Sequence, residues 1–474
     1  MWWISPTNGE PMTTVVRLGG GETEVVARSA MPVSAQALFD WHERAGAFER
    51  LTPSWMPARV LARSGGIHDG ATVSLAVPLG PLSLRWDVRH EGYTPGRGFR
   101  DVQTRGPFAA WTHHHGMEPA TDGTSVLEDR IRYRLPLGAL ADLVAGRFAA
   151  GELTRLLRWR HALTAGDLAR HQRFASRGPR RIAITGASGF VGAALVPFLT
   201  TGGHEVRGIG RGAGADIRWD PTRGTLDATR LEGVDAVIHL AGENVGARWT
   251  AARRRAIVES RVRGTRLLAE ACARLTVKPE VLVSASAIGI YGVRGDEWLD
   301  ESSALGDDFL AEVGQAWEAA TAPARDAGIR VVHLRIGIVL NPAGGALGKM
   351  RLPFQLGVGG RLGSGRQWMS WISREDLVGA IHHALQTPSL HGPVNAVAPT
   401  PVTNAEFTRV LARVLRRPAI APVPAVALRA LFGEMAQGTV LASQRVRPTA
   451  LEASGFQFLH PTLEKALRFE LGRG

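Results

Sequence analysis

Two patterns of hydrophobic residues divide the chain into two parts. In the first part, about residues 1–175, apolar and polar residues alternate, as over 73–77, which predicts half-buried antiparallel strands. A short helix is expected near 34–44 and a long amphipathic helix over about 140–171. This order of elements predicts an α+β domain in which a curved sheet grips a helix.

In the second part, 181–474, short apolar runs alternate with helical patterns, which is typical of an α/β fold with a doubly wound parallel sheet. Between the parts, residues 176–180 lose the periodicity and carry Ser, Gly and Pro, so a short linker is expected there. The runs expected to be strands are 181–185, 204–209, 217–219, 236–240, 281–286 and 331–339.

The first of these strands runs directly into the sequence TGASGFVG and then into a helix pattern. Gly186 can turn the chain sharply, Gly189 lets the backbone approach a pyrophosphate, and Gly192 lets the helix pack close to the sheet. The free N–H groups and the positive dipole end of the helix would hold the diphosphate. The alternative is a glycine-rich turn without a ligand. The loop residues predicted to bind a dinucleotide are Gly186, Ser188, Gly189, Phe190, Val191 and Gly192.

The end of the second strand indicates which dinucleotide is bound. Arg211 lies where an NAD enzyme places an acid against the ribose 2′-hydroxyl, and a cation there suits a 2′-phosphate, so NADP is preferred over NAD. The alternative is a solvated arginine in an arginine-rich chain. Asp220, at the end of the third strand, is expected beside the adenine. After the fourth strand, Ala241 and Gly242 are small enough for the backbone to approach a cofactor.

The net charge and the cysteine count indicate in which compartment the protein works and which partners it binds. The chain has 474 residues and a net charge of +13, but the charge comes almost wholly from arginines spread along the sequence, so no nucleic-acid partner is predicted. Cys272 is the only cysteine, which suits a reducing cytoplasm. Met1–Ile4 lack the cationic start of a signal peptide, and no run approaches the ~20 apolar residues of a membrane helix. A cytoplasmic protein without membrane contact is expected.

The first part resembles a known superfamily over most of its length, and the motif that carries the resemblance is residues 99–115, which read FRDVQTRGPFAAWTHHH. This order of residues is similar to that of START-like SRPBCC proteins. The resemblance implies a helix-grip fold whose cavity binds apolar or amphipathic small molecules.

Three consecutive histidines in this stretch raise the question of a metal site. Strand alternation places His113 and His115 on one face and His114 on the other. Asp129 interrupts an otherwise apolar face and is expected to look into the same cavity. Because two histidines supply too few ligands, no metal is predicted, and polar pocket lining or structural histidines are the favoured interpretations.

The second part resembles the extended short-chain dehydrogenase/reductase superfamily, which contains nucleotide-sugar epimerases, through TGASGFVG, HLAGEN and SASAIGIYG. The segments RWT at 248–250 and GSGRQ at 363–367 narrow this likeness to an epimerase-like atypical branch, and 420–474 resembles its C-terminal extension. The resemblance implies a Rossmann domain with a small C-terminal substrate lobe. It also implies cofactor contacts from Arg211, Leu240, Ala241 and Arg261.

The usual acid/base pair of that superfamily is missing. Relatives use Tyr-x-x-x-Lys one helix after the fifth strand, and these positions fall on Leu310 and Gly314. Ser286 stands where the substrate-positioning serine belongs, and Tyr291 is a second catalytic candidate. The alternative for Tyr291 is packing before a glycine turn.

Two hypotheses therefore remain open for the function. The chain is an NADP-dependent oxidoreductase or epimerase that acts on a small molecule through Ser286 and Tyr291, with an apolar substrate held or delivered by the N-terminal cavity. Alternatively, it binds NADP(H) without turnover, as a sensor or assembly protein. Substrate identity and oligomeric state are not predicted.

Overall fold

The computed structural model describes residues 11–56, 58–79, 82–136 and 139–473, so Met1–Ile4 lie outside it. The chain divides into two compact units. One consists of Met1–Gly178 with Thr200–Gly203 and Gly474, and the other of Pro179–Leu199 with His204–Arg473. Within the described ranges, no helix is both long enough and apolar enough to cross a membrane.

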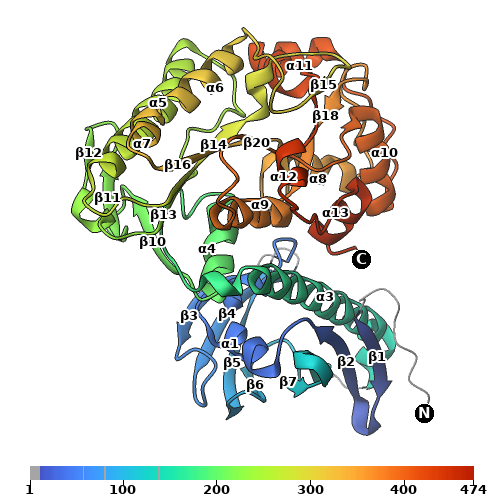
Figure 1. Ribbon diagram of the computed structural model, residues 1–474. Helices are drawn as coiled ribbons and strands as arrows, with labels where there is room; N and C mark the ends of the chain where they lie inside the picture. The colour runs from blue at the N-terminus through green and yellow to red at the C-terminus, as the bar shows by residue number, and fades with distance from the viewer. Residues whose placement is uncertain (1–10, 57, 80–81, 137–138, 474) are drawn as a thin grey trace. The chain divides into compact units, whose positions relative to one another are not determined.

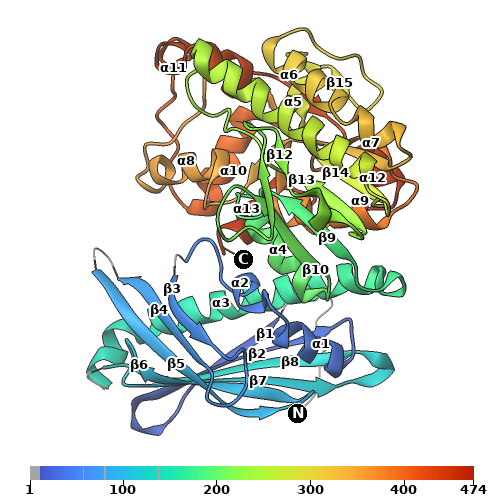
Figure 2. The same cartoon turned by 90° about the vertical axis from the view of Figure 1, so that its left-hand side faces the viewer.

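The first unit is built on one eight-stranded sheet in the order β1-β2-β8-β7-β6-β5-β4-β3. All neighbouring strands in it are antiparallel. Figure 2 shows the long helix α3 crossing one face of this sheet. The strands are β1 Met12–Arg17, β2 Glu22–Met31, β3 Arg59–Ser64, β4 Thr72–Leu79, β5 Leu82–Thr94, β6 Gly98–Arg105, β7 Ala110–Pro119 and β8 Ser125–Arg134. The helices are α1 Ala35–Glu43, α2 Ala47–Arg50 and α3 Ala139–Arg173.

The two helices expected from the pattern are present as α1 and α3. Ser34 caps α1, because its Oγ accepts a hydrogen bond from Ala37 N at 3.2 Å. Two clusters of buried apolar side chains fill the space between the sheet and the helices. One joins α1 to β2, β7 and β8, and the other joins α3 to β2 and β8.

The second unit is organised around another eight-stranded sheet in the order β12-β11-β10-β9-β13-β14-β16-β20. The strands pair in parallel except β12, which is antiparallel to β11. The strands are β9 Arg181–Thr185, β10 Glu205–Gly210, β11 Ile217–Asp220, β12 Thr225–Leu226, β13 Ala236–His239, β14 Val281–Ala287, β16 Arg330–Ile336 and β20 Gly392–Ala396.

Helices cover both faces of this sheet, as the doubly wound pattern predicts (Figure 1). Buried side chains of α4 and α9 pack on one face, and those of α5 and α7 pack on the other. The helices are α4 Gly192–Thr201, α5 Ala251–Arg274, α6 Phe309–Ala319, α7 Ala322–Asp326, α8 Gly345–Gln355, α9 Arg374–Gln386, α10 Asn404–Leu415, α11 Ala425–Phe432, α12 Thr449–Ala453 and α13 Leu463–Glu470.

One expected strand is shorter than predicted. The run 331–339 was expected to be continuous, but β16 ends at Ile336, and β17 Ile338–Leu340 belongs to a separate pair with β19 Trp371–Ser373. Gly337 lies at the break, where an added Cβ would be only 2.5 Å from Ser370 O. Two further small sheets pair β15 Trp298–Leu299 with β22 Arg445–Val446 and β18 Trp368–Met369 with β21 Val402–Thr403.

Candidate cofactor and substrate site

The strand order of the second unit reverses at β9, which lies between β10 and β13. In open parallel sheets, ligands bind beyond the carboxyl ends of the strands at such a reversal. Thr185, the last residue of β9, ties these ends together. Its Oγ1 lies 2.7 Å from His239 Nδ1 and accepts hydrogen bonds from Leu240 N and Ala241 N at 3.1 and 3.2 Å. Thr185 carried no sequence signal beyond being the last strand residue.

Each glycine of the loop after β9 is restricted by a close contact. Gly186 has φ +70°, and a Cβ there would lie 3.1 Å from Ala241 N, so the loop passes directly over the end of β13. A Cβ at Gly189 would lie 3.1 Å from Gly186 O, and one at Gly192 would lie 2.1 Å from the same atom. Gly192 was expected to let the helix pack close to the sheet, and its nearest contacts are with the carbonyls of its own loop.

The other predicted loop residues are arranged as a turn that opens α4. Ser188 is exposed, while Phe190 and Val191 are half-buried. Val191 O accepts hydrogen bonds from the backbone N–H groups of Ala194 and Leu195, both at 3.0 Å, and so starts the helix. The Phe190 ring covers the beginning of α8, where a Cβ on Gly344 would be 3.0 Å from the ring.

Arg211 and Asp220 lie at the ends of neighbouring strands. Arg211 follows β10 and is exposed, with its carbonyl accepting a hydrogen bond from Arg218 Nη1 at 3.0 Å. The Asp220 carboxylate accepts hydrogen bonds from Thr222 N and Oγ1 at 3.0 and 2.6 Å, and these bonds hold its pKa below the usual value. Asp220 therefore closes the turn after β11.

The loop after β13 is held by a half-buried cation on α5. Arg261 Nη1 donates to Glu243 O at 3.0 Å, and a Cβ on Gly242 would be 3.4 Å from the guanidinium carbon. The same guanidinium lies 4.7 Å from the centre of the Trp317 ring. Burial lowers the pKa of Arg261 to about 10. Leu240 and Ala241 are half-buried beside this loop.

Two further polar residues approach the same loop. Glu243 Oε1 pairs with Arg253 Nη1 at 2.9 Å. Lys349, on α8, donates from Nζ to Gly246 O at 2.8 Å. The cation of Lys349 therefore lies beside the segment that follows β13.

Ser286 belongs to a buried hydrogen-bonded network. Its Oγ donates to Glu318 Oε1 at 2.7 Å, and only 3% of its surface is exposed. Arg335 holds the Glu318 carboxylate by two bonds of 2.9 Å, from Nε and Nη2. Sequence reasoning assigned no role to Arg335 or to Glu318. Their contacts join β14, α6 and β16, which no local pattern records.

Tyr291 lies at the other end of this network. The Tyr291 side chain is fully buried. Its hydroxyl donates a hydrogen bond to Asn395 Oδ1 at 2.7 Å and accepts one from Arg335 Nη1 at 3.0 Å. Burial raises the pKa of Tyr291 to about 12, although Arg335 opposes the shift. These contacts favour the packing alternative, and a catalytic role for Tyr291 stays a prediction.

The two positions of the missing acid/base pair lie on α6. Leu310 is half-buried, and a Cβ on Gly289 would be 3.4 Å from its Cβ. A Cβ on Gly314 would lie 2.9 Å from the Cβ of Ile290. Any side chain at position 314 would therefore have to move α6 away from the segment 288–291.

The first unit contains a cavity of about 420 Å³. His113 and His115 line it and are buried, whereas His114 is exposed, as strand alternation predicts. Asp129 is also buried, beside both histidines. The apolar lining includes Val73, Leu75, Trp86, Val88, Phe99 and Ile131.

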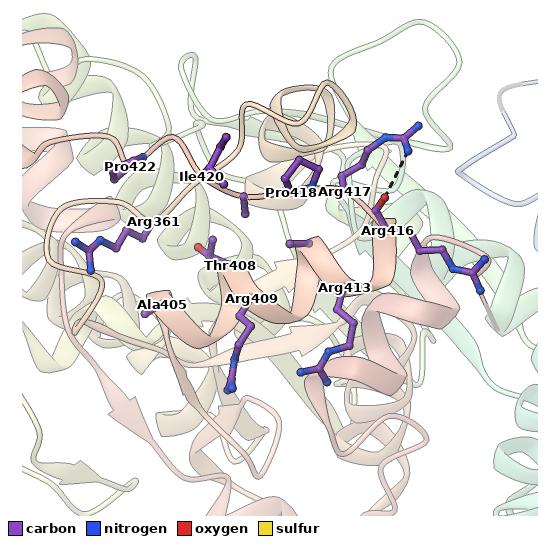
Figure 3. A pocket seen from close by; sticks show the side chains of 12 residues that line it. Arg361, Ala405, Thr408, Arg409, Arg413, Arg416, Arg417, Pro418, Ile420 and Pro422 are labelled. Atoms are coloured by element: carbon purple, nitrogen blue, oxygen red, sulfur yellow. Dashed lines mark hydrogen bonds between the residues drawn. The ribbon is translucent and has the colours of Figure 1, made fainter.

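A hollow of about 760 Å³ lies along α10 in the second unit. Figure 3 shows the arginines around it, and its dashed line is the hydrogen bond from Arg417 Nη1 to Arg416 O at 3.4 Å. Arg413 pairs with Glu464 at 3.1 Å. The lining residues include none of the predicted site residues, so this hollow is not the candidate site. Its arginines are Arg361, Arg409, Arg413, Arg416 and Arg417.

The parallel sheet, the glycine loop at its reversal point and the adjoining cation define a dinucleotide-binding protein with a Rossmann-like sheet. The chain belongs to the NAD dependent epimerase/dehydratase family, whose model matches residues 182–397. Residues 423–470 match a second model, described as a Domain of unknown function (DUF1731). The expected family is thereby confirmed for the second part of the chain.

Relatives and solved structures agree with this assignment. Epimerase family protein Mb2239 of Mycobacterium bovis is 46% identical over 296 residues, which are 62% of this chain and 98% of that protein. The nucleoside-diphosphate sugar epimerase of Corynebacterium glutamicum is 36% identical, with a TM-score of 0.78 over 94% of this chain and 90% of that one. Human epimerase family protein SDR39U1 (isoform2), solved with NADPH, is 36% identical, with a TM-score of 0.58 over 61% of this chain and 99% of that one.

Proposed function

We propose that the chain is an NADP(H)-dependent oxidoreductase or epimerase that acts on a small molecule. The observation that carries this proposal is the convergence of the glycine loop, Thr185 and the Arg261-supported loop at one end of the sheet. A Cβ at Gly192 would collide with backbone, and one at Gly186 would crowd Ala241 N, so the residues present fit a cradle for a dinucleotide. When bound, the nicotinamide supplies hydride transfer.

Two observations support NADP over NAD. Arg211 is exposed at the end of β10, where it can meet a 2′-phosphate. The human relative that shares 36% of its sequence was solved with NADPH. A guanidinium–phosphate hydrogen bond is worth about 1.5–3 kcal/mol, which corresponds to about 10- to 100-fold in affinity.

Ser286 is the residue proposed to contact the reacting substrate oxygen. Because its single hydroxyl proton is donated to Glu318, the lone pairs of Oγ remain available to accept a hydrogen bond from a substrate hydroxyl. Arg335 fixes the Glu318 carboxylate through two hydrogen bonds, so Ser286 is kept in this orientation. Glu318 and Arg335 are positioning residues, and Tyr291 steadies Arg335 through its hydroxyl.

Cofactor preference is tested by titrating the full chain with NADPH and NADH under fluorescence detection. Arg211→Ala is expected to weaken NADPH by about 10- to 100-fold and to leave NADH unchanged. Arg266→Ala is the matched control, since Arg266 is an exposed arginine on α5 that pairs with Glu270. Equal loss for both cofactors, or no loss, would contradict the assignment of the 2′-phosphate.

Turnover is tested by following NADPH loss with a panel of carbonyl compounds and sugar nucleotides. Ser286→Ala is expected to lower kcat at least about 100-fold while the Kd for NADPH stays unchanged. Ser284→Ala is the control, because it lies on the same strand and donates to Ala285 O. Tight NADPH binding without turnover on any substrate would favour the alternative, a cofactor-dependent binding protein.

For the first unit, we propose a separate START-like ligand-binding domain, with 1–175 and 181–474 as the two functional domains. An antiparallel sheet crossed by a long helix, with a cavity of about 420 Å³ in the same unit, supports this proposal. Native mass spectrometry of the full chain purified from cells is expected to detect an apolar small molecule. Trp86→Arg, which places a charge in the lining, is expected to remove it.

A further inference from the structure

A group made of buried histidines, the buried Asp129 and the half-buried Asp101 lies at one side of the cavity in the first unit. His113 and His115 on β7 lie close to Asp101 on β6, with His115 Nε2 3.4 Å and His113 Nδ1 3.9 Å from Asp101 Oδ2. One donor atom from each of these three residues lies within 4.8 Å of the other two. Ligand atoms bound at about 2.0–2.2 Å from one metal ion are separated by about 3–3.5 Å, so small side-chain movements would complete the geometry.

We propose that Asp101, His113 and His115 bind one divalent transition-metal ion, Zn²⁺ or Fe²⁺, at the wall of this cavity. Two imidazoles and one carboxylate form a donor set that suits both ions. The sequence-based expectation of no metal rested on the number of ligands. Asp101 supplies the third one, because the antiparallel pairing of β6 and β7 places it opposite His113.

The second carboxylate holds the histidines in the orientation that this site needs. Asp129 Oδ1 lies 3.1 Å from His113 Nε2 and 2.7 Å from His115 Nδ1. These are the ring nitrogens that do not approach Asp101, so Nδ1 of His113 and Nε2 of His115 are left for the metal. Histidine ligands of metals almost always donate their other N–H group to such a carboxylate.

Both carboxylates are themselves held from behind by further histidines. His161 Nε2 lies 2.9 Å from Asp129 Oδ2, and its other nitrogen lies 2.9 Å from Ser29 Oγ. His90 Nδ1 lies 2.6 Å from Asp101 Oδ1 and leaves Oδ2 for the ion. Each of the three proposed ligands therefore has a further polar neighbour, which is Asp129 for the two histidines and His90 for Asp101, as is common around metal sites.

The position of the three ligands gives the class of molecule that would meet the metal. All three line the cavity, whereas the outer carboxylate, Asp129, lies against the opposite nitrogens of the histidines. Three protein ligands on one side leave coordination positions open toward the cavity, as in catalytic metal sites. The cavity is otherwise mainly apolar, so it suits an apolar molecule with one oxygen donor, such as a carbonyl, enolate or carboxylate.

The test uses the full chain, without a histidine tag and after chelator treatment. Titration with ZnCl₂ by calorimetry is expected to show one ion per chain, and loading with Co²⁺ is expected to give visible absorption bands typical of nitrogen and oxygen ligands. Asp101→Asn is expected to weaken Zn²⁺ by more than about 100-fold, and Asp129→Asn by about 10- to 100-fold. His114→Gln is the matched control and should bind like the wild type, because His114 is exposed on the opposite face of β7.

X-ray absorption of the zinc-loaded wild type keeps the proposal testable if the variants do not fold. Two imidazoles and at least one oxygen ligand are expected around the ion. Absence of stoichiometric binding, a spectrum without imidazole, or equal affinity in Asp101→Asn would show that the group is a metal-free hydrogen-bonded cluster or that the ion binds elsewhere. Loss of binding in His114→Gln would equally overturn the assignment.

Discussion

Among single glycine-to-alanine changes in the glycine loop after β9, Gly192→Ala is expected to disrupt the loop most. The added Cβ would lie 2.1 Å from Gly186 O and 2.7 Å from Ala187 O, and both of these atoms belong to the backbone. Since carbon–oxygen contacts below 3.0 Å are essentially never seen, the loop would have to move by almost 1 Å. Overpacking of this kind costs about 1–3 kcal/mol.

The remaining loop positions give a graded series. Gly186→Ala places a side chain at φ +70° and is expected to cost about 1–2 kcal/mol for the left-handed conformation. Gly189→Ala meets only Gly186 O, at 3.1 Å, and is expected to be milder. Gly212→Ala is the control, because its Cβ would meet nothing within 4 Å and its φ is not positive. It should be neutral or stabilising by up to about 1 kcal/mol.

The series is measured by guanidinium unfolding and by NADPH titration of each variant. Because the loop forms part of the proposed cradle, Gly192→Ala should lose NADPH affinity at least tenfold, and Gly212→Ala should keep it. The reasoning is refuted if Gly192→Ala unfolds at the wild-type midpoint and binds NADPH as the wild type does. A loss in Gly212→Ala equal to that in Gly192→Ala would refute it as well.

Three further predictions follow from buried groups of the second unit. Burial, with the charge of Arg261, lowers the pKa of His239 to about 4. Because the unfolded chain takes up the proton first, the free energy of unfolding should be highest above pH 6.5 and should fall by roughly 3 kcal/mol between pH 6.5 and pH 4. His239→Gln should flatten this part of the stability profile, whereas the same change at the exposed His391 should not. Burial raises the pKa of the Cys272 thiol to about 12, so a maleimide should label it only after unfolding, and labelling of the native chain would contradict its burial. Gly314→Ala should cost about 1–3 kcal/mol in unfolding free energy, because its Cβ would meet Ile290; an unchanged midpoint would show that α6 adjusts freely.

Hydrophobic periodicity was sufficient to predict the parallel sheet, and the glycine spacing after the first strand predicted the loop. The period of the apolar residues reflects which side of each element is buried, and this can be seen within a short stretch of sequence. Five strands lie on the expected runs: β9, β10, β11, β13 and β14. The same signal failed at Gly337, because a break forced by a neighbouring carbonyl depends on a segment over thirty residues away.

The sequence did not predict which side chains from distant elements are in contact. Ser286 was found through its position in a motif, but its partner Glu318 lies 32 residues later and Arg335 lies 17 residues beyond that. In the first unit, strand alternation correctly separated His114 from its neighbours. It could not show that Asp101 lies opposite His113, since strand register is set by pairing rather than by period.

The contacts of α6 explain why the acid/base pair cannot be restored by simple substitution. Gly314 brings this helix against Ile290, so a lysine there would displace α6 and with it Glu318, four residues along the same helix. Glu318 in turn holds Ser286. The packing that excludes the lysine is therefore the same packing that orients the serine. Because a side chain at position 314 would displace α6, Leu310→Tyr with Gly314→Lys should lower any turnover that depends on Ser286 rather than raise it. Higher turnover in that double variant would show that the two devices are independent.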